Sequence, residues 1–388
     1  MKILFLFTFL SFTLAAKELK IYKFSVGGAD SQLVVFPSGY SILIDAGEPT
    51  RAKNEGDAGV NGKYLAKRIQ QILGKKKVDV FVLSHYHWDH HGGYEKGGIW
   101  YLIEKAGFTF GKFIKRNIGT YTGSKFADCN KNTIKWKYVG PMSSSEAKFV
   151  CYATSSNEKT KLSKIGELAQ RCSKTQIVPP DDNSEVKIII RDAMGVKDAD
   201  GNKLTRNSMK DEHPVAENDF SICLRIVYGK FVYITCGDLS GFTKGISEQT
   251  FQYHDIESLI APMVGEVDVM HINHHGSSSA TNSKWCNTLK PTVAISSCGD
   301  GSVGVKKVGM KNLKKVNATV YTTGLAGGSK DDEYYKDMIR MGDDVVISVP
   351  ENGKEFTITN SKGEKKKTYP IKQNKVKAVK CHKLEDDA

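Results

Sequence analysis

The segment Ser84–Gly93, with the sequence SHYHWDHHGG, is the feature that most constrains what this chain can fold into. It contains four potential metal ligands: His85, His87, Asp89 and His90. The apolar run 78–83 directly before it is typical of a buried strand. The ligands are therefore expected in a loop at a sheet edge, where functional groups are common. A histidine-rich surface loop that binds metal adventitiously is the plain alternative.

The spacing of these ligands indicates how they divide. His85 and His87 are two residues apart, so both imidazoles can converge on one ion. Asp89 and His90 point elsewhere along the turn and can hold a second ion. Imidazole and carboxylate ligands suit zinc, manganese or iron.

Two later segments also place metal ligands at the ends of predicted strands. Strands 222–228 and 231–236 form a hairpin that turns at Gly229–Lys230 and leads to Asp238. A strand over 267–272 leads to His274 and His275. Seven of the ten histidines lie in 85–91 and 271–275, whereas chance placement would scatter them.

The rest of the chain shows a β-rich pattern with few helices. Strands at 19–26, 32–36 and 40–44 form an antiparallel opening, and apolar residues at helical spacing predict a helix over 62–73. Further strands are expected at 292–297, 319–323, 345–349 and 355–359. The interval 94–217 is the least regular, with one expected helix at 157–171.

His-x-His-x-Asp-His followed by glycine resembles the signature of the metallo-β-lactamase fold. Five features together resemble its ComEC-like branch, the extracellular hydrolase domain of bacterial DNA-uptake channels, and the pneumococcal-type phosphorylcholine esterase looks similar. The features are Val26–Asp30, Leu43–Gly47, the His85 segment, Asn218 with Ser221 and Gly237–Asp238, and His274–Ser277. The resemblance implies an α/β protein: an αββα sandwich over 17–360 with an irregular insertion at 94–217.

The residue types and this resemblance suggest roles for each ligand. His85 and His87 are expected to bind one metal, while Asp89, His90 and His275 bind the second and Asp238 bridges the two. Zinc is the expected ion, and manganese is the alternative that the same ligands can bind. Asp89 and His274 are the catalytic candidates, with His274 contacting phosphate or protonating a leaving oxygen. His274 and His275 could exchange roles, because neighbours on a strand face opposite sides.

Two supporting residues follow from the same comparison. Asp45, at the end of a predicted strand, is expected to orient the metal-bearing loop. The family that this chain resembles carries a further motif histidine in the region corresponding to 94–217. His213 is the candidate for that histidine here. His213 stands beside Pro214 and outside any clear strand, so the chain departs from the full family pattern there.

The resemblance implies a phosphodiesterase, with DNA as the commonest substrate class, acting through a metal-activated hydroxide. Residues 1–16 resemble a secretory signal, so export is expected. The net charge of +13 favours polyanions, with a lysine-rich compositional bias as the alternative, and 361–388 is expected to be a mobile basic tail. The other readings are a phosphorylcholine-type phosphodiesterase, a lactone or β-lactam hydrolase, and a non-catalytic metal-binding protein.

The eight cysteines include no CxxC pair, so they do not indicate a zinc ribbon. If the hairpin turns at Gly229–Lys230, the residue numbers of paired positions sum to 459, which places Cys223 opposite Cys236. Counting from the turn, this is a non-hydrogen-bonded pair, where Cα atoms approach to about 4.5 Å. A cross-strand disulfide is therefore predicted, with two free buried thiols as the alternative.

Overall fold

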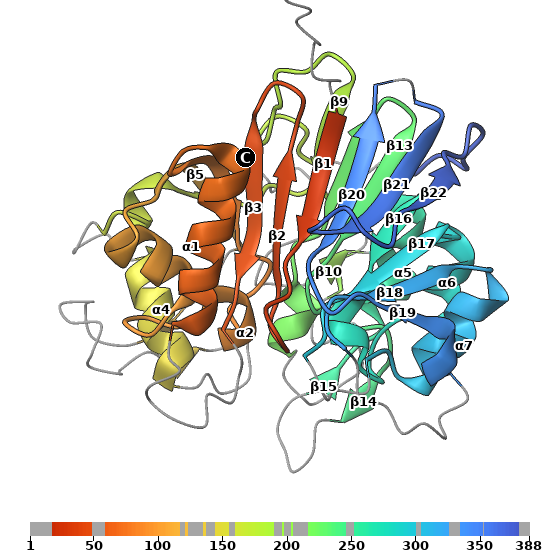
Figure 1. The fold of residues 1–388 in the computed structure, drawn as a ribbon. Helices are drawn as coiled ribbons and strands as arrows, with labels where there is room; N and C mark the ends of the chain where they lie inside the picture. The colour runs from red at the N-terminus through yellow and green to blue at the C-terminus, as the bar shows by residue number, and fades with distance from the viewer. Residues whose placement is uncertain are drawn as a thin grey trace, which may run out of the picture.

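The computed structural model describes most of the chain as two β-sheets packed face to face, with helices on the outer sides (Figure 1). The described residues are 18–48, 59–116, 121–122, 135–136, 144–154, 160–189, 196–197, 203–204, 216–245, 252–299, 304–325, 334–351 and 353–379. The predicted signal 1–16 and His213 lie outside them. None of the helices among the described residues has the length and apolar character needed to cross a membrane.

The first sheet has nine strands in the order β22-β21-β20-β1-β2-β3-β4-β5-β8. Its strands are β1 (Glu18–Lys23), β2 (Ser31–Val35), β3 (Ser41–Ala46), β4 (Lys77–Val82), β5 (Thr109–Lys115), β8 (Gly166–Leu168), β20 (Val345–Pro350), β21 (Glu355–Asn360) and β22 (Lys367–Pro370). The opening strands pair antiparallel, as predicted, and β3, β4, β5 and β8 pair in parallel. The C-terminal strand β20 pairs with β1, so both ends of the described chain meet in one sheet.

The second sheet has seven strands in the order β19-β18-β17-β16-β13-β12-β9. Its strands are β9 (Ser184–Ile188), β12 (Leu224–Tyr228), β13 (Phe231–Thr235), β16 (Val269–His271), β17 (Val293–Ser296), β18 (Thr319–Thr322) and β19 (Met338–Arg340). Three two-stranded pieces lie apart: β6 (Tyr121–Thr122) with β7 (Lys135–Trp136), β10 (Val196–Lys197) with β11 (Lys203–Leu204), and β14 (Lys244–Gly245) with β15 (Gln252–Tyr253).

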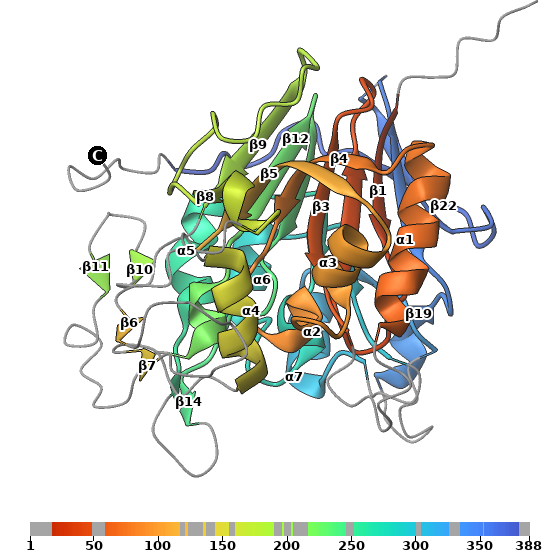
Figure 2. The same ribbon diagram turned by 90° about the vertical axis from the view of Figure 1, so that its left-hand side faces the viewer.

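The longer helices cover the outer faces of the two sheets (Figures 1 and 2). They are α1 (Val60–Leu73), α4 (Ser144–Thr154), α5 (Ile256–Val264), α6 (Ser283–Leu289) and α7 (Lys307–Lys315). The shorter ones are α2 (Trp88–His91), α3 (Gly98–Trp100), η2 (Tyr101–Lys105), η3 (Ser163–Ile165), η4 (Glu217–Phe220), η5 (Asn273–Gly276) and η6 (Tyr335–Asp337).

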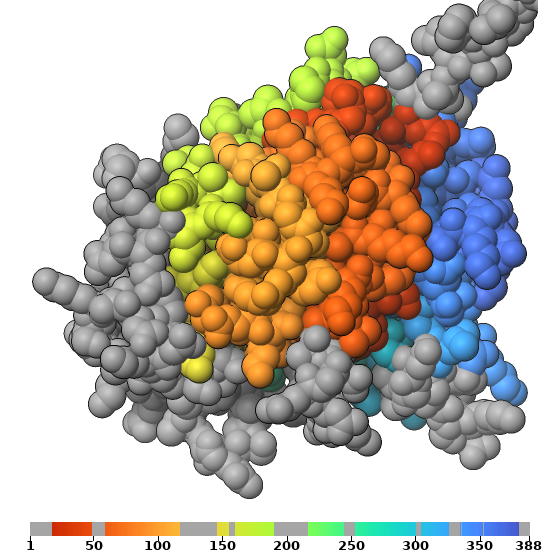
Figure 3. Space-filling model, turned by 60° about the vertical axis from the view of Figure 1, so that its left-hand side comes forward, coloured from red at the N-terminus to blue at the C-terminus, as the bar shows by residue number. Residues whose placement is uncertain are grey.

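Three apolar clusters hold these layers together. The central cluster lies between the sheets and joins residues such as Ile21 and Val80 to Ile226 and Val269. A second cluster packs α1 and α4 on the first sheet, and a third packs α5, α6 and α7 on the second. This is the predicted αββα sandwich. Residues between β3 and β5 form a continuous surface over the first sheet, with the C-terminal strands along one edge (Figure 3).

The interval 94–217 is only partly an insertion. It supplies β5 and β8 to the first sheet and β9 to the edge of the second, so these parts of the predicted irregular insertion belong to the sandwich. The helix expected at 157–171 is also wrong. The helix lies at Ser144–Thr154, where Phe149 and Val150 are buried, and Gly166–Leu168 is extended because it pairs with β5.

The described part of the basic tail is folded rather than mobile. Residues 367–370 form β22, which pairs with β21. Beyond it, the backbone N–H of Lys372 donates to Asp268 at 3.0 Å, and that of Val379 donates to the Pro262 carbonyl at 2.9 Å. The prediction that order ends near 360 is therefore wrong for residues 361–379.

Candidate metal centre

The predicted ligands gather where strands of both sheets end at the same edge of the sandwich. The loop after β4 carries His85 and His87 and then forms α2, which lies at that edge in both ribbon views (Figures 1 and 2). From the second sheet, β13 leads to Asp238 and β16 leads to His275. Parallel strands deliver their carboxyl ends to one edge, which explains why segments far apart in sequence meet here.

Asp45, at the end of β3, supports the metal-bearing loop as predicted. Its Oδ1 accepts a hydrogen bond from the backbone N–H of Ser84 at 2.7 Å, and its Oδ2 accepts one from the Ser84 hydroxyl, also at 2.7 Å. The same Oδ2 lies 2.8 Å from Nδ1 of His90. Asp45 has a positive φ of 57°, a conformation that aspartate tolerates better than most residues. The contact with Asp45 fixes the His90 ring so that its Nε2 points away from Asp45.

Glycine allows the two halves of the site to approach closely. Gly237 has a φ of 55°, and a Cβ at this position would lie 2.4 Å from the Ser84 hydroxyl oxygen. Its carbonyl accepts a hydrogen bond from the backbone N–H of His274 at 3.1 Å. Any larger residue would separate the loop after β4 from the loop after β13.

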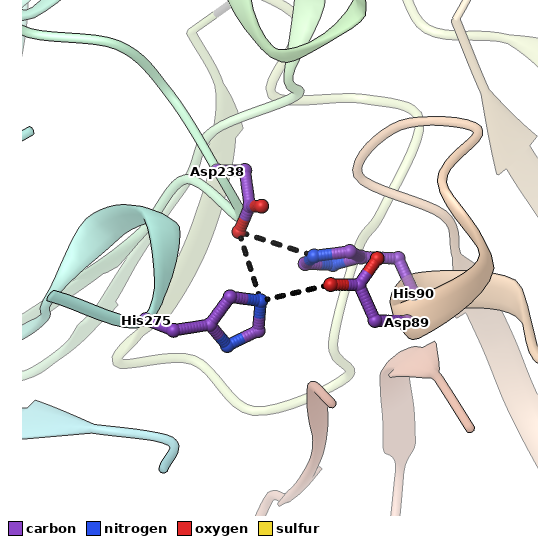
Figure 4. A group of neighbouring side chains, drawn as sticks. All are labelled: Asp89, His90, Asp238 and His275. Carbon is purple, nitrogen blue, oxygen red and sulfur yellow. Dashed lines mark ion pairs between the residues drawn. The ribbon is translucent and has the colours of Figure 1, made fainter. Parts of the chain in front are cut away.

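The first ligand group consists of Asp89, His90, Asp238 and His275, whose ligand atoms all lie within 4.8 Å of one another. Nε2 of His275 lies 3.4 Å from Oδ2 of Asp89 and 3.4 Å from Oδ1 of Asp238. Nε2 of His90 lies 3.1 Å from the same Oδ1. Figure 4 shows all four side chains pointing toward one another.

The second ligand group consists of His85, His87 and Asp238. Nε2 of His85 lies 3.0 Å from Nδ1 of His87 and 3.9 Å from Oδ2 of Asp238. Nε2 of His87 faces the carboxylate of Glu146 at 4.0 Å. Asp238 therefore presents Oδ1 to one group and Oδ2 to the other.

These spacings fit metal ions. Two ligands about 2.0–2.1 Å from a tetrahedral zinc lie about 3.3–3.4 Å apart, close to the separations within the first group. Nε2 of His90, Nε2 of His275 and Oδ1 of Asp238 are buried, and each nitrogen lies 3.1 or 3.4 Å from that oxygen, so the three atoms are satisfied only if a proton or a cation lies between them. A buried polar group left unsatisfied costs about 1–3 kcal/mol, and a cation at this point would satisfy all three.

The charge balance also favours a cation. Burial opposes ionisation of Asp238, but His275, His90 and His274 hold the pKa of its carboxyl well below the usual range. Burial likewise opposes protonation of His275, yet Asp238 and Asp89 raise the pKa of His275 to about 9. The buried carboxylates are thus stabilised by nearby positive charge. In the metal-free protein, protonated histidine supplies this charge.

A third group, formed by Asp30, Asp45 and His90, has a different explanation. The fully buried Lys23 makes an ion pair with Asp30, which also accepts a hydrogen bond from Ser297. Asp45 is already occupied by its hydrogen bonds to Ser84 and His90. This group is therefore a buried support behind the metal centre, with the Lys23 ammonium as its cation.

His274 lies beside the two ligand groups and belongs to neither among the described residues. Its Nδ1 is 2.7 Å from the Ser279 hydroxyl, and its Nε2 is 3.7 Å from Oδ2 of Asp238. His274 and His275 both adopt left-handed φ values of 50°, which turns the two rings to different positions. The structure places His275, rather than His274, in the first ligand group.

Tyr253, at the end of β15, lies beside His274 and was not singled out by the sequence. Its ring lies 5.6 Å from that of His274, with 73° between the ring planes. Burial, together with the negative charges of Asp238 and Asp219, raises the pKa of Tyr253 to about 12. Its hydroxyl therefore stays protonated at neutral pH and can donate a hydrogen bond.

Residues 26–96 match the family model described as the Metallo-beta-lactamase superfamily. Among curated proteins, none matches the sequence.

Similar solved structures include a putative metal-dependent hydrolase from Parabacteroides distasonis, at 12% identity over 81% of this chain and 94% of that chain, with a TM-score of 0.38. Another is a diphosphatase of the PhnP family, at 10% identity over 87% and 100% of the two chains, with a TM-score of 0.36. Unliganded yeast PDE1 shares 9% identity over 79% and 88%, with a TM-score of 0.32.

The match at 26–96 spans the Asp45 segment and the His85–His90 ligands, and the two-sheet architecture is the sandwich of the same fold. The matched segment covers less than half of the chain. Together with the clustered histidines and aspartates, it indicates a metal-binding site in a protein of this fold.

Proposed function

We propose that the protein is a secreted phosphodiesterase of the ComEC-like type that hydrolyses extracellular DNA with two divalent metal ions. The observation that carries this proposal is the position of Asp238, whose two oxygens face two separate ligand groups. A shared carboxylate is suited to hold two ions about 3.5–4 Å apart, the spacing used by many enzymes that cleave phosphate esters.

The residues of the metal centre have distinct proposed roles. His85, His87 and Asp238 would hold one ion, and Asp89, His90, Asp238 and His275 the other. Zinc suits this donor set and manganese is second; the ions would stabilise charge on the phosphate and lower the pKa of water. His274, oriented by Ser279, turns Nε2 toward the centre, where it can contact phosphate or give a proton to the leaving oxygen.

Export is supported by the cysteines as well as by the sequence of residues 1–16. Cys223 is bonded to Cys236, and Cys151 and Cys172 are each disulfide-bonded. Disulfides persist mainly in oxidising compartments such as the extracellular space.

A DNA substrate is supported by the net charge of +13, to which the C-terminal segment 361–388 contributes. Within that segment, Lys375 forms an ion pair with Asp268 at 2.8 Å, and Lys372 donates to backbone carbonyls of the body. These two lysines stabilise the fold, and their ammonium groups are already engaged by the protein. The phosphate contacts would therefore come from other lysines of the chain.

Hydrolysis of three substrates tests the proposal: bis(p-nitrophenyl) phosphate, plasmid DNA and nitrocefin, each with and without a chelator. The expected result is chelator-sensitive cleavage of the first two and no turnover of nitrocefin. The Asp238→Ala variant serves as the metal-site control and should be inactive. Cleavage of the small diester without DNA would favour a phosphorylcholine-type substrate, whereas turnover of nitrocefin alone would overturn the proposal.

A further inference from the structure

Three consecutive residues of η4 contact three different parts of the metal centre. Glu217 accepts a hydrogen bond from the backbone N–H of Tyr86 at 2.8 Å, within the segment that carries His85 and His87. The Asn218 amide lies 3.4 Å from the His274 ring. Asp219 contacts His254, which follows Tyr253 in the chain. This short helix therefore ties the ligand loops to the β14–β15 pair.

The contact between Asp219 and His254 fixes the position of Tyr253. A single oxygen, Oδ2 of Asp219, accepts the backbone N–H of His254 at 3.1 Å and lies 2.8 Å from Nδ1 of its ring. Asp219 is fully buried and His254 is 6% exposed, so water competes little for this contact. On its other side, Tyr253 pairs with Lys244 across the β14–β15 strands.

Held in this way, Tyr253 lies beside His274, and its hydroxyl is close enough to Asp238 and Asp89 for the charges of these carboxylates to act on it. Its ring meets that of His274 edge to face, 5.6 Å away. Within the described part of the chain, its hydroxyl makes no hydrogen bond. A phosphodiester at this centre would carry charged non-bridging oxygens, which accept hydrogen bonds roughly twice as strong as those to neutral oxygens.

We propose that Tyr253 is a substrate-binding residue that donates a hydrogen bond to a phosphate oxygen, and that Asp219 is a positioning residue that holds it there through His254. This inference rests on the proposed function, since it assumes that a phosphate group occupies the metal centre. Tyr253 lies outside all the sequence motifs that point to the metal centre.

The test compares Tyr253→Phe, which removes only the hydroxyl, with Tyr152→Phe as a matched control. Tyr152 is a buried tyrosine on α4 whose hydroxyl already donates to Glu104 at 3.1 Å. The readouts are calorimetric binding of inorganic phosphate to the metal-loaded protein and kcat/KM for bis(p-nitrophenyl) phosphate. A hydrogen bond to a charged group is worth about 1.5–3 kcal/mol, so Tyr253→Phe should weaken both by roughly 10- to 100-fold. Tyr152→Phe should leave both unchanged.

Asp219→Asn tests the positioning role by a double-mutant cycle. The loss in Asp219→Asn/Tyr253→Phe should not exceed that in Tyr253→Phe alone, because both changes remove the same contact. Additive losses in phosphate affinity would show that Asp219 acts independently of Tyr253 and would overturn its assigned role. Metal content, measured for each variant, should remain that of the wild type.

The outcomes separate this inference from the proposed function. If the wild type cleaves the diester and Tyr253→Phe retains full phosphate affinity and activity, the inference fails and the proposed function stands. If the wild type binds phosphate, needs Tyr253 for it and cleaves no diester, the phosphate contact stands and the proposed activity fails. Absence of phosphate binding by the metal-loaded wild type overturns the inference directly.

Discussion

Nδ1 of His90 lies 2.8 Å from Oδ2 of Asp45, and this contact decides which ring nitrogen of His90 faces the metal centre. With the proton of the neutral ring on Nδ1, Nε2 is free to bind a metal. Such partners of ligand histidines typically contribute 10- to 100-fold to metal affinity.

Asp45→Asn should therefore weaken metal binding by roughly 10- to 100-fold. An amide nitrogen in place of Oδ2 would donate to Nδ1 of His90 and leave the proton on Nε2, the wrong nitrogen for a ligand. Asparagine tolerates the φ of 57° at this position, so the metal-free fold should keep its thermal stability. Titration against a competing chelator measures the affinity.

The matched control is Asp79→Asn. Asp79 accepts hydrogen bonds from the backbone N–H and the hydroxyl of Ser41, at 2.8 and 3.0 Å, and so supports the same two strands without contacting a ligand histidine. Its substitution should leave metal affinity at the wild-type level. Equal loss in both variants would show that Asp45 acts only through general stability.

Glu257 predicts a pH-dependent stability. Its buried carboxylate accepts hydrogen bonds from Asn273 and from the backbone N–H groups of Thr281 and Asn282, which shapes the loop after His275. Burial raises the pKa of Glu257 from 4.5 to about 7 despite these bonds. The folded state thus holds a proton that the unfolded state releases above about pH 4.5, so this group's contribution to stability falls as the pH rises toward 7 and is constant above it.

Glu257→Gln tests this sign. The variant should be less stable than the wild type, because one amide oxygen replaces two acceptors. The gap should shrink between pH 4.5 and pH 7 by up to about 3 kcal/mol, taking 1.36 kcal/mol per pKa unit. Urea unfolding of the metal-free proteins across this range measures it. A gap that widens with pH would show that the carboxylate is stabilised in its charged form.

The disulfide between Cys223 and Cys236 has the register predicted from the hairpin turn. Tyr228 pairs with Phe231 and Leu224 with Thr235, and the Cα atoms of the two cysteines are 4.0 Å apart. Replacing both cysteines with alanine should lower the free energy of unfolding by about 3 kcal/mol, the value for a loop of this size. Mass mapping of unreduced peptides should find the linked pair in protein from an oxidising compartment, and alkylatable thiols at both positions would refute it.

Local pattern was enough to predict many of the strands and to place the ligands at strand ends, and the family resemblance added the sandwich. Strands such as Val345–Pro350 alternate or run continuously apolar because one or both faces are buried, and turn residues fix the 222–236 register. His85, His90, Asp238 and His275 follow predicted strands directly. The parallel pairing that brings their ends together follows from the fold itself.

What the sequence could not supply depends on contacts between distant segments. Gly166–Leu168 is a strand only because β5 offers it an edge, and residues 372–379 are ordered because Asp268 and Glu266 accept their backbone N–H groups. The roles of Asp219 and Tyr253 arise from partners on separate loops. Each of these residues, taken alone, has the local sequence of an ordinary turn or surface position.

The number of metal ions per chain tests the central claim, that Asp238 is shared by two sites, most directly. After loading with zinc and removal of excess ion, elemental analysis should find two ions in the wild type. His87→Ala, at a partly exposed position, should retain one ion, whereas Asp238→Ala should lose both. One ion in the wild type, or one ion retained by Asp238→Ala, would contradict the shared carboxylate.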